Sequence, residues 1–285
     1  MSGVSVTKAV IPAAGLGTRI LPATKTIPKE LLTLVDRPMI QYVVEEAAGA
    51  GCTDVVIVVS PDKTALEDYF RPAPTLERAL EAKGKNDLLA LVRQTTSIAN
   101  VSFAVQAEPL GLGHAVLCAR ERIGDEAFAV LLPDELFGGS SLLRALIATY
   151  ERFDASVIAV MEMPPDEISN YGVVDPEPVD ADVVRMKGFV EKPPPDEAKS
   201  NLGSIGRYVL TSEIFDALEQ TLPGAGGEIQ LTDAVSKVGG YAYIHRGRRE
   251  DAGRPLGYLK AIVELALERE DIGKEFGEFL AELDL

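Results

Sequence analysis

The first 29 residues of the chain contain four cationic side chains and neither Asp nor Glu. These cations are Lys8, Arg19, Lys25 and Lys29. The whole chain has the opposite balance, because its 44 acidic residues outnumber its 28 basic ones. Within this stretch an apolar run at 9–11 leads into a turn of mostly small residues at 12–18. Exposed backbone N–H groups close to cations bind phosphate oxygens, so the segment predicts a cradle for a polyphosphate.

The glycine loop at 15–17 matches neither of two common nucleotide-binding templates. Thr18-Arg19-Ile20 follows the loop, so the third glycine of the dinucleotide fingerprint is missing. The Gly-Lys-Ser/Thr sequence of a P-loop does not occur either. We therefore expect neither a nicotinamide-dependent dehydrogenase nor a P-loop NTPase. A lone Gly-x-Gly is also common in a plain strand-to-helix connection, and the nearby cations are what favour phosphate binding.

A carboxylate at the end of an apolar run is the second candidate feature. Asp134 follows the run 128–132, which places it where a parallel strand would leave a sheet. The chain has only two histidines and two cysteines, so we expect no histidine-rich or thiolate metal site and no disulfide framework. A bound metal would then be a hard cation held by carboxylates and phosphates, for which Mg²⁺ is the natural candidate. The alternative is that Asp134 only caps a helix.

The elements that must position these residues alternate between strand and helix. Short, continuous apolar runs predict buried strands, and segments of helical period lie between them. The strands are expected at 9–11, 55–59, 101–105, 127–132 and 156–160, and the helices at 38–48, 76–92, 112–122 and 142–153. This order is typical of an α/β protein with a Rossmann-like, mostly parallel mixed sheet flanked by helices. Ligands of such sheets bind beyond the carboxyl ends of the strands.

The rhythm of the sequence changes near residue 170. Shorter strands are expected at 171–175, 183–191 and 203–210, followed by helices at 212–220, 230–237, 256–268 and 272–283. The proline run 193–195 and the segment 223–227 are either surface loops or mobile lids. The 46% hydrophobic content is ample for a buried core, and we expect one domain over residues 1–285.

Charge and hydropathy exclude several classes of partner. The net charge of −16 argues against a nucleic-acid-binding or membrane-binding surface. No apolar run approaches the ~20 residues of a membrane span, and the start of the sequence lacks the basic-then-apolar layout of a secretory signal. We expect a soluble, cytoplasmic protein that confines its positive charge to one cleft.

A series of motifs along nearly the whole chain resembles one enzyme family. The matching segments are 14–19, 22–25, 28–32, 106–114, 132–134, 170–172, 189–193, 227–233 and 251–258. In this order they resemble the sugar-1-phosphate nucleotidyltransferases, most closely the bacterial branch that acts on UTP and glucose 1-phosphate. The resemblance assigns residues 1–165 mainly to a nucleotide side, and residues 166–285 mainly to a sugar side and C-terminal helices.

The resemblance implies a reaction and its partners. UMP would pass from UTP to glucose 1-phosphate with the help of Mg²⁺, giving UDP-glucose and pyrophosphate. Both reactants are anions, so we expect catalysis by charge neutralisation and in-line positioning without a covalent intermediate. Two alternatives remain, a thymidylyltransferase acting on dTTP and a non-catalytic regulatory protein that binds nucleotide sugars. The family also implies a homodimer or homotetramer, for which the C-terminal helices are one candidate contact.

The resemblance assigns roles on the nucleotide side. Arg19 and Lys25 would face the β- and γ-phosphates, and Lys29 would lie near the reacting phosphate. Gln106 would read the base, and Glu30 would reach the base or ribose. The other nucleotide-binding residues implied are Ala14, Gly15, Leu16, Gly17, Thr18, Gly111 and Gly113. His114 is left open between a capping or packing role and a ligand contact.

The resemblance also assigns the metal and the sugar. Asp134 and Asp251 would hold Mg²⁺, and Lys192 would neutralise the attacking phosphate. Sugar binding falls to Gly172, Glu191 and Gly206. Without the family pattern, Glu191 and Lys192 would read as an exposed ion pair before a proline. Arg207 and the segment 230–233 are expected to shape or support the sugar end.

Overall fold

The protein, described here from a computed structural model over residues 6–283, is built on one nine-stranded sheet. Its strands in spatial order are β5 (Asn100–Val105), β4 (Asp54–Val59), β1 (Lys8–Pro12), β6 (Phe128–Leu131), β11 (Leu202–Leu210), β8 (Val157–Glu162), β12 (Tyr241–Ile244), β10 (Val183–Glu191) and β9 (Gly172–Pro178). Only β10 and β11 run against the other strands of this sheet. The prediction of a mostly parallel mixed sheet is confirmed.

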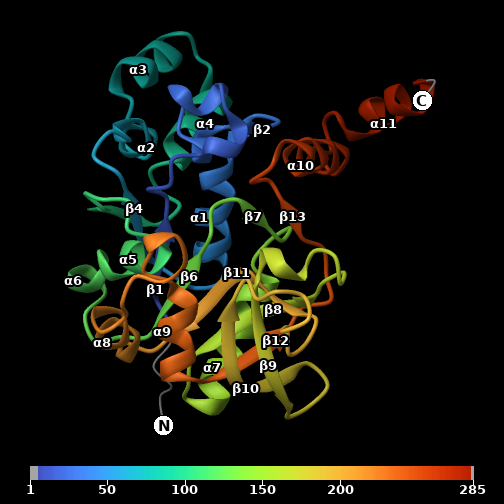
Figure 1. The fold of residues 1–285 in the computed structure, drawn as a ribbon. Helices are drawn as coiled ribbons and strands as arrows, with labels where there is room; N and C mark the ends of the chain where they lie inside the picture. Colours follow the sequence, from blue (N-terminus) through green and yellow to red (C-terminus); the bar gives the residue numbers. More distant parts are fainter. Residues whose placement is uncertain (1–5, 284–285) are drawn as a thin grey trace.

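Helices cover both faces of the sheet (Figure 1). Along β1, Ala9 and Ile11 belong to one buried cluster while Val10 belongs to the other, because successive side chains of a strand point to opposite faces. On the first face lie α1 (Met39–Gly49) and α7 (Ser141–Phe153). On the second lie α5 (Leu112–Leu117), α6 (Arg120–Ile123), α8 (Glu213–Glu219) and α9 (Leu231–Val238). The strand β1 is therefore apolar on both faces, and the glycine loop at 15–17, predicted to bind phosphate, follows this inner strand of the sheet.

Two of the predicted helices are broken in the structure. The segment 76–92 forms α3 (Pro74–Ala82) and α4 (Asn86–Gln94), because Gly84 takes a left-handed φ of 64° between them. The segment 112–122 is likewise divided between α5 and α6. The predictions of one helix over 76–92 and one over 112–122 are therefore wrong. The helix α2 (Thr64–Tyr69) and the strand β12 were not predicted.

Two short two-stranded ribbons are separate from the nine-stranded sheet. One pairs β2 (Thr33–Leu34) with β3 (Arg37–Pro38), and the other pairs β7 (Glu135–Leu136) with β13 (Glu250–Asp251). In the second ribbon, Asp251 lies opposite Glu135 and the Ala252 N–H donates to the Asp134 carbonyl over 2.8 Å. This ribbon brings two acidic segments together that are more than a hundred residues apart in the sequence.

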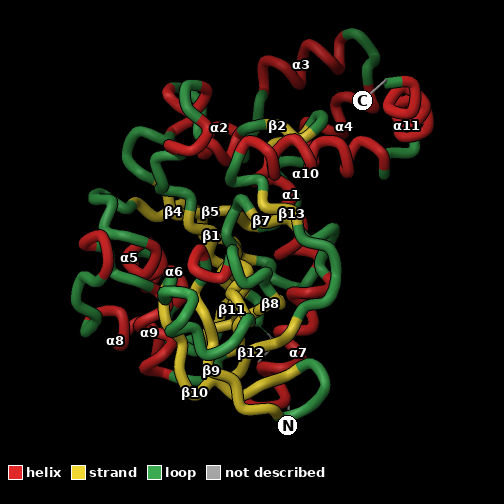
Figure 2. The backbone as a smooth tube through the Cα atoms, turned by 45° about the vertical axis from the view of Figure 1, so that its right-hand side comes forward, coloured by secondary structure: helices red, strands yellow, loops and turns green. Residues whose placement is uncertain are grey.

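The C-terminal helices α10 (Pro255–Leu267) and α11 (Gly273–Glu282) extend away from the sheet in both views (Figure 1, Figure 2). Helix α10 contributes Ala261 to the buried core, and its Tyr258 hydroxyl donates to the Thr33 carbonyl over 2.7 Å. Leu256, Leu259 and Phe279 are exposed along the pair. Among residues 6–283, no helix has the length and apolar character needed to cross a membrane.

Candidate active site

The loop after β1 is the segment that the sequence analysis predicts to bind phosphate. Gly17 has a left-handed φ of 65°, and a Cβ atom there would lie 3.2 Å from Thr24 Cβ and 3.3 Å from Lys29 Cβ. The Thr24 hydroxyl donates to the Gly17 carbonyl over 2.7 Å and holds the turn. At Gly15, by contrast, a Cβ atom would have no other atom within 4 Å. The backbone of the loop is therefore fixed on one side and accessible on the other.

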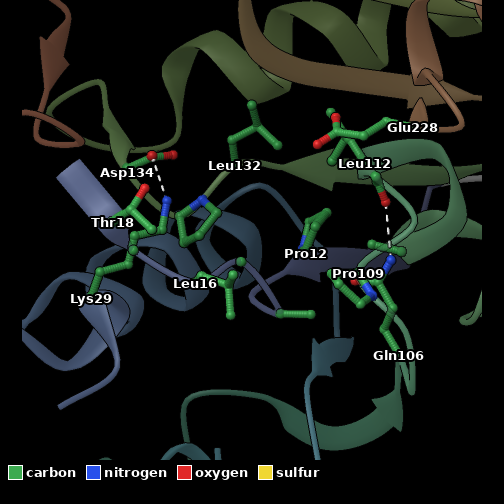
Figure 3. A pocket seen from close by; sticks show the side chains of 16 residues that line it. Pro12, Leu16, Thr18, Lys29, Gln106, Pro109, Leu112, Leu132, Asp134 and Glu228 are labelled. Carbon is green, nitrogen blue, oxygen red and sulfur yellow. Dashed lines mark hydrogen bonds and ion pairs between the residues drawn. The ribbon is translucent and has the colours of Figure 1, made fainter. Parts of the chain in front are cut away.

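The loop forms one wall of a cavity of about 430 Å³ (Figure 3). Its lining is Pro12, Ala14, Gly15, Leu16, Gly17, Thr18, Lys29, Gln106, Pro109, Gly111, Leu112, Ala115, Leu132, Pro133, Asp134 and Glu228. We call this space the nucleotide cavity, after the ligand that the sequence analysis predicts for its residues. Four of the residues predicted for the nucleotide side, Arg19, Lys25, Glu30 and Gly113, are absent from this lining, and the others are present.

A second cavity of about 240 Å³ adjoins the first. It is lined by Arg19, Leu112, Leu132, Asp134, Glu135, Asn170, Tyr171, Gly172, Glu191, Lys192, Ser204, Gly206, Tyr208, Glu228, Gln230, Thr232, Arg249, Asp251 and Arg254. We call it the sugar cavity, again after the ligand that the sequence analysis predicts. The two cavities share Leu112, Leu132, Asp134 and Glu228, so Asp134 lies at their junction. Gly172, Glu191, Lys192 and Gly206, the residues predicted to bind the sugar or its phosphate, all line the sugar cavity, and so does Arg19.

Lys29 and Asp134 form an ion pair at the junction. The Lys29 ammonium donates to Asp134 Oδ2 over 2.7 Å, with the two side chains 20% and 19% exposed (Figure 3). Burial opposes the charge of Asp134, but the Lys29 ammonium outweighs it and lowers the pKa of the carboxyl. Burial likewise opposes the charge of Lys29, but Asp134 and Glu30 raise its pKa. Both groups are therefore charged at neutral pH.

The two predicted metal ligands lie close together and line the same cavity. A Cβ atom on Gly253 would lie 2.7 Å from Asp134 Oδ2 and 3.1 Å from Asp251 Oδ1, so both carboxylates border one small space. The Gly253 N–H donates to Asp251 Oδ1 over 3.0 Å and helps to orient it. Two carboxylate oxygens beside open polar space suit a hard cation that takes its remaining ligands from phosphate and water. No cluster of three or more His, Cys, Asp or Glu ligands occurs among residues 6–283.

Arg207 holds the backbone on both sides of Asp134. Its guanidinium is 0% exposed and donates to the carbonyls of Leu132 (2.9 Å) and Glu135 (2.6 Å). The same group makes two bonds, of 2.9 and 2.8 Å, to the carboxylate of Glu46 in α1. The Gly206 carbonyl accepts a further bond of 2.9 Å. Arg207 thus ties the segment that carries Asp134 to α1, a support that the sequence analysis located only roughly.

Arg249 provides a second clamp that the sequence analysis missed. Its guanidinium donates to both carboxylate oxygens of Glu135 over 2.7 and 2.6 Å and to the Tyr171 hydroxyl over 3.3 Å. Burial raises the pKa of Glu135 to about 7, against the opposing effect of Arg249. Because Glu135 and Asp251 pair across the ribbon, this clamp fixes the spacing between the two acidic segments. The acidic residue after Asp134 was the only signal in the sequence.

Glu30 lies under the phosphate loop. Its side chain is fully buried and pairs with Lys63 over 2.8 Å, while Lys63 also donates to the Ala13 carbonyl over 2.6 Å. Burial raises the pKa of Glu30, although the charges of Lys63 and Lys29 oppose the shift. The pair supports the start of the loop from below. The predicted contact of Glu30 with a base or ribose stays a prediction.

Lys25 and Gly113 also lie outside the cavity linings. Lys25 is exposed at the end of the short turn Ala23–Lys25. A Cβ atom on Gly113 would meet the Ile229 carbonyl at 2.7 Å, and the Gly113 N–H donates to that carbonyl over 2.8 Å. The glycine therefore lets the start of α5 pack directly on the segment 228–230.

The end of β10 presents Glu191 and Lys192 to the sugar cavity. Glu191 accepts a bond of 2.6 Å from the Thr232 hydroxyl and pairs with the Lys192 ammonium at 3.0 Å. Lys192 has a left-handed φ of 45°, which is uncommon for a residue with a side chain and is typical of functional sites. A Cβ atom on Gly172 would lie 3.3 Å from Glu191 Oε2, so a larger residue would crowd this carboxylate.

Comparisons with known proteins agree with this arrangement. The family model described as "Nucleotidyl transferase" matches residues 8–268, and the chain belongs to this family. Within it, the chain is 48% identical over 280 residues to "UTP--glucose-1-phosphate uridylyltransferase" of Bacillus subtilis (strain 168), a match that covers 96% of each chain. The same name is carried by a relative from Staphylococcus epidermidis that is 46% identical over 285 residues, or 98% of this chain and 99% of the relative.

Solved structures give the same result. The structure titled "UTP-bound UGPase from acinetobacter baumannii" aligns with a TM-score of 0.90 and 43% identity over 98% of this chain and 100% of that one. The structure titled "The Crystal Structure of UDP-glucose pyrophosphorylase complexed with UDP-glucose" aligns with a TM-score of 0.83 and 40% identity over 93% and 100%. The resemblance predicted from the motifs is confirmed.

Proposed function

We propose that the protein transfers UMP from UTP to glucose 1-phosphate and is a UTP--glucose-1-phosphate uridylyltransferase. A phosphate oxygen of the sugar would attack the α-phosphorus of UTP, the bond to the β-phosphate would break, and pyrophosphate would leave. The observation that carries the proposal is the junction of the two cavities at Asp134, with Lys29 on the nucleotide side and Lys192 on the sugar side. The near full-length similarity to uridylyltransferases supports it.

On the nucleotide side, the loop and its cations would bind the triphosphate. The accessible backbone at Gly15 and Leu16 suits phosphate oxygens. Arg19 lines the adjoining sugar cavity, and its planar guanidinium would contact two phosphate oxygens at once. Lys29 is half-buried and paired with Asp134, so its compact charge would act on the phosphate that reacts. Lys25 is exposed at the outer edge and would add charge attraction only.

On the sugar side, Glu191 and Lys192 would bind different parts of glucose 1-phosphate. The Glu191 carboxylate is held by Thr232 and can accept from sugar hydroxyls. The Lys192 ammonium would neutralise the phosphate of glucose 1-phosphate as it approaches UTP. Repulsion between two anions is the main obstacle to the reaction, so fixed cations on both sides of the reacting centre lower the barrier.

Asp134 and Asp251 are the residues that would hold Mg²⁺. When bound there, the ion would polarise the reacting phosphate and offset the charge that develops on the leaving pyrophosphate. The shared space beside Gly253 supports this assignment, as does the chemistry of two carboxylates facing a polyphosphate.

Three broader predictions stay proposals. A single domain over residues 1–285 is supported by the continuous sheet, in which β11 from the second half lies beside β6 from the first. The linings of the two cavities also mix the two halves, since Glu228 borders the nucleotide cavity and Arg19 the sugar cavity. We also propose that the protein is located in the cytoplasm and assembles as a homodimer or homotetramer.

Pyrophosphate release tests the proposal. The purified protein is incubated with Mg²⁺, glucose 1-phosphate and each of UTP, dTTP, CTP, ATP and GTP in parallel. We expect the largest kcat/KM with UTP and none without the sugar phosphate. Equal or faster turnover with dTTP would indicate a thymidylyltransferase. Stabilisation by UDP-glucose without turnover of any triphosphate would indicate a binding protein instead.

A further inference from the structure

The amide of Gln106 is held at two points beside the nucleotide cavity. Gln106 follows β5 directly and is only 5% exposed. Its Nε2 atom lies 3.0 Å from the Gly111 carbonyl oxygen, a bond drawn in Figure 3, and 3.0 Å from Nδ1 of His114. The sequence analysis left the role of His114 open, and none of the phosphate or sugar contacts uses it.

The Gly111 carbonyl decides the orientation of this amide. A carbonyl oxygen can only accept, so the group 3.0 Å away must be the NH₂ of Gln106 and not its oxygen. The same NH₂ then faces Nδ1 of His114, which has to accept the second proton. This contact therefore selects the tautomer of His114 in which Nδ1 accepts and the ring proton is on Nε2.

Both N–H groups of the Gln106 amide therefore donate to atoms of the protein, to the Gly111 carbonyl and to His114 Nδ1. The remaining polar atom of this amide is the oxygen Oε1. No buried side-chain nitrogen or oxygen among residues 6–283 lacks a hydrogen-bond partner, and the described residues offer none to Oε1 of Gln106. The oxygen is therefore not sealed in the core, and it belongs to a residue that lines the nucleotide cavity. The group that this amide can offer to a base is a hydrogen-bond acceptor.

The Gly111 anchor is itself fixed. Gly111 has a φ of 101°, and a Cβ atom there would lie 2.7 Å from Glu228 Cβ. The Ile229 N–H donates to the Leu110 carbonyl over 2.7 Å, and the Gly113 N–H donates to the Ile229 carbonyl over 2.8 Å. This two-way pairing holds the segment 110–113 on the segment 228–229. The direction of the Gly111 carbonyl is therefore set before any ligand arrives.

We propose that His114 is a positioning residue for base selection, which keeps the acceptor of Gln106 directed at the base. The inference rests on the proposed function and deepens it. Uracil carries a proton on N3, which an acceptor can bind, whereas N3 of cytosine carries a lone pair that an acceptor repels. Thymine has the same N3–H as uracil, so the device separates UTP from CTP and not from dTTP. His114 acts through Gln106 and does not itself contact the base.

Calorimetric binding of UTP and CTP, without sugar phosphate, tests this role separately from turnover. The variants are His114→Leu and His114→Ala, which remove the acceptor, and His114→Asn, whose side-chain oxygen can accept from a similar position. We expect the wild type to prefer UTP. The preference should fall about tenfold in the Leu and Ala variants, as expected for one lost hydrogen bond, and stay within about threefold in the Asn variant.

A purely structural role for His114 predicts a different pattern. Both nucleotides would then lose affinity together and the preference would not change, which would overturn the inference. The inference also fails if the wild type does not prefer UTP, or if the Asn variant loses the preference as fully as the Leu variant. Collapse of both the Leu and Ala variants in thermal melting would assign His114 to packing. Absence of pyrophosphate release by the wild type would contradict the proposed function alone.

Discussion

Replacing Arg207 by Met is expected to separate the stability of the protein from the positioning of Asp134. Arg207 is fully buried, and so is most of its partner Glu46, which is 5% exposed. The change leaves the Glu46 carboxylate buried without its cation and removes the donors to the carbonyls of Leu132 and Glu135. Breaking such a buried pair from one side costs about 3–5 kcal/mol.

The size of the chain converts this cost into a melting temperature. The 285 residues, at ~2.1 cal/mol/K each, give an unfolding entropy of roughly 0.6 kcal/mol/K. A loss of about 3–5 kcal/mol therefore lowers Tm by about 5–8 °C. The matched control is Arg152→Met, because Arg152 forms an exposed pair with Asp180 at 2.6 Å. Exposed pairs contribute about 0–1 kcal/mol, so the control should melt within about 2 °C of the wild type.

The double variant Arg207→Met/Glu46→Leu distinguishes the two roles of the clamp. In the double variant, Glu46 no longer leaves an unpaired carboxylate in the core. We therefore expect it to recover at least half of the decrease in Tm that Arg207→Met causes. The backbone around Asp134 still lacks its two donors, and a misplacement of ~1 Å can lower turnover about 100-fold. We therefore expect low kcat and a raised Mg²⁺ requirement in both variants, measured by pyrophosphate release. If the double variant regained stability and turnover together, Arg207 would not position Asp134.

Further predictions concern the reacting centre. Asp134→Asn keeps the shape of the side chain but removes a carboxylate from the cavity junction. We expect kcat to fall about 10³-fold, which corresponds to an activation barrier raised by about 4 kcal/mol, while Tm changes by only a few degrees. A near-normal rate would refute the metal role. Lys192→Ala should mainly raise KM for glucose 1-phosphate, and an effect confined to UTP would contradict the sugar-side assignment. Because the pKa of Asp134 is lowered on folding, its pairing with Lys29 stabilises the protein above the unfolded pKa of ~3.9 and is lost as pH falls through the folded value. The difference in unfolding free energy between wild type and Asp134→Asn should therefore shrink below about pH 4, and a constant difference would argue against the pairing. Gly206→Ala should reduce both stability and turnover, because its φ is 74° and a Cβ atom would lie 2.9 Å from Leu132.

Much of the nucleotide half could be predicted because its signals are local. The buried strands β1, β4 and β6 are short runs of apolar residues, and the small residues after β1 mark the loop directly. Asp134 could be placed at a strand end for the same reason. The break between α3 and α4 was harder to predict, because a single Gly84 within a helical pattern is often tolerated.

The supports of the site could not be predicted because they depend on long-range contacts. Arg207 and Glu46 are 161 residues apart in sequence, and Arg249 and Glu135 are 114 apart. No local pattern connects either pair, so buried clamps and exposed ion pairs look alike in the sequence. Glu30 shows the same limit, since only the structure reveals that Lys63 holds it beneath the phosphate loop. The strand β12 follows two glycines and became apparent only through its pairing with β8 and β10.

The central claim is that two neighbouring cavities let two repelling anions meet at Asp134. A crystal structure of the protein with UDP-glucose and Mg²⁺ tests it most directly. The account predicts the uracil ring beside Gln106, the glucose hydroxyls at Glu191, and the diphosphate next to Asp134 and Lys192. A product molecule bound away from this junction, or one that places its sugar in the nucleotide cavity, would contradict the account.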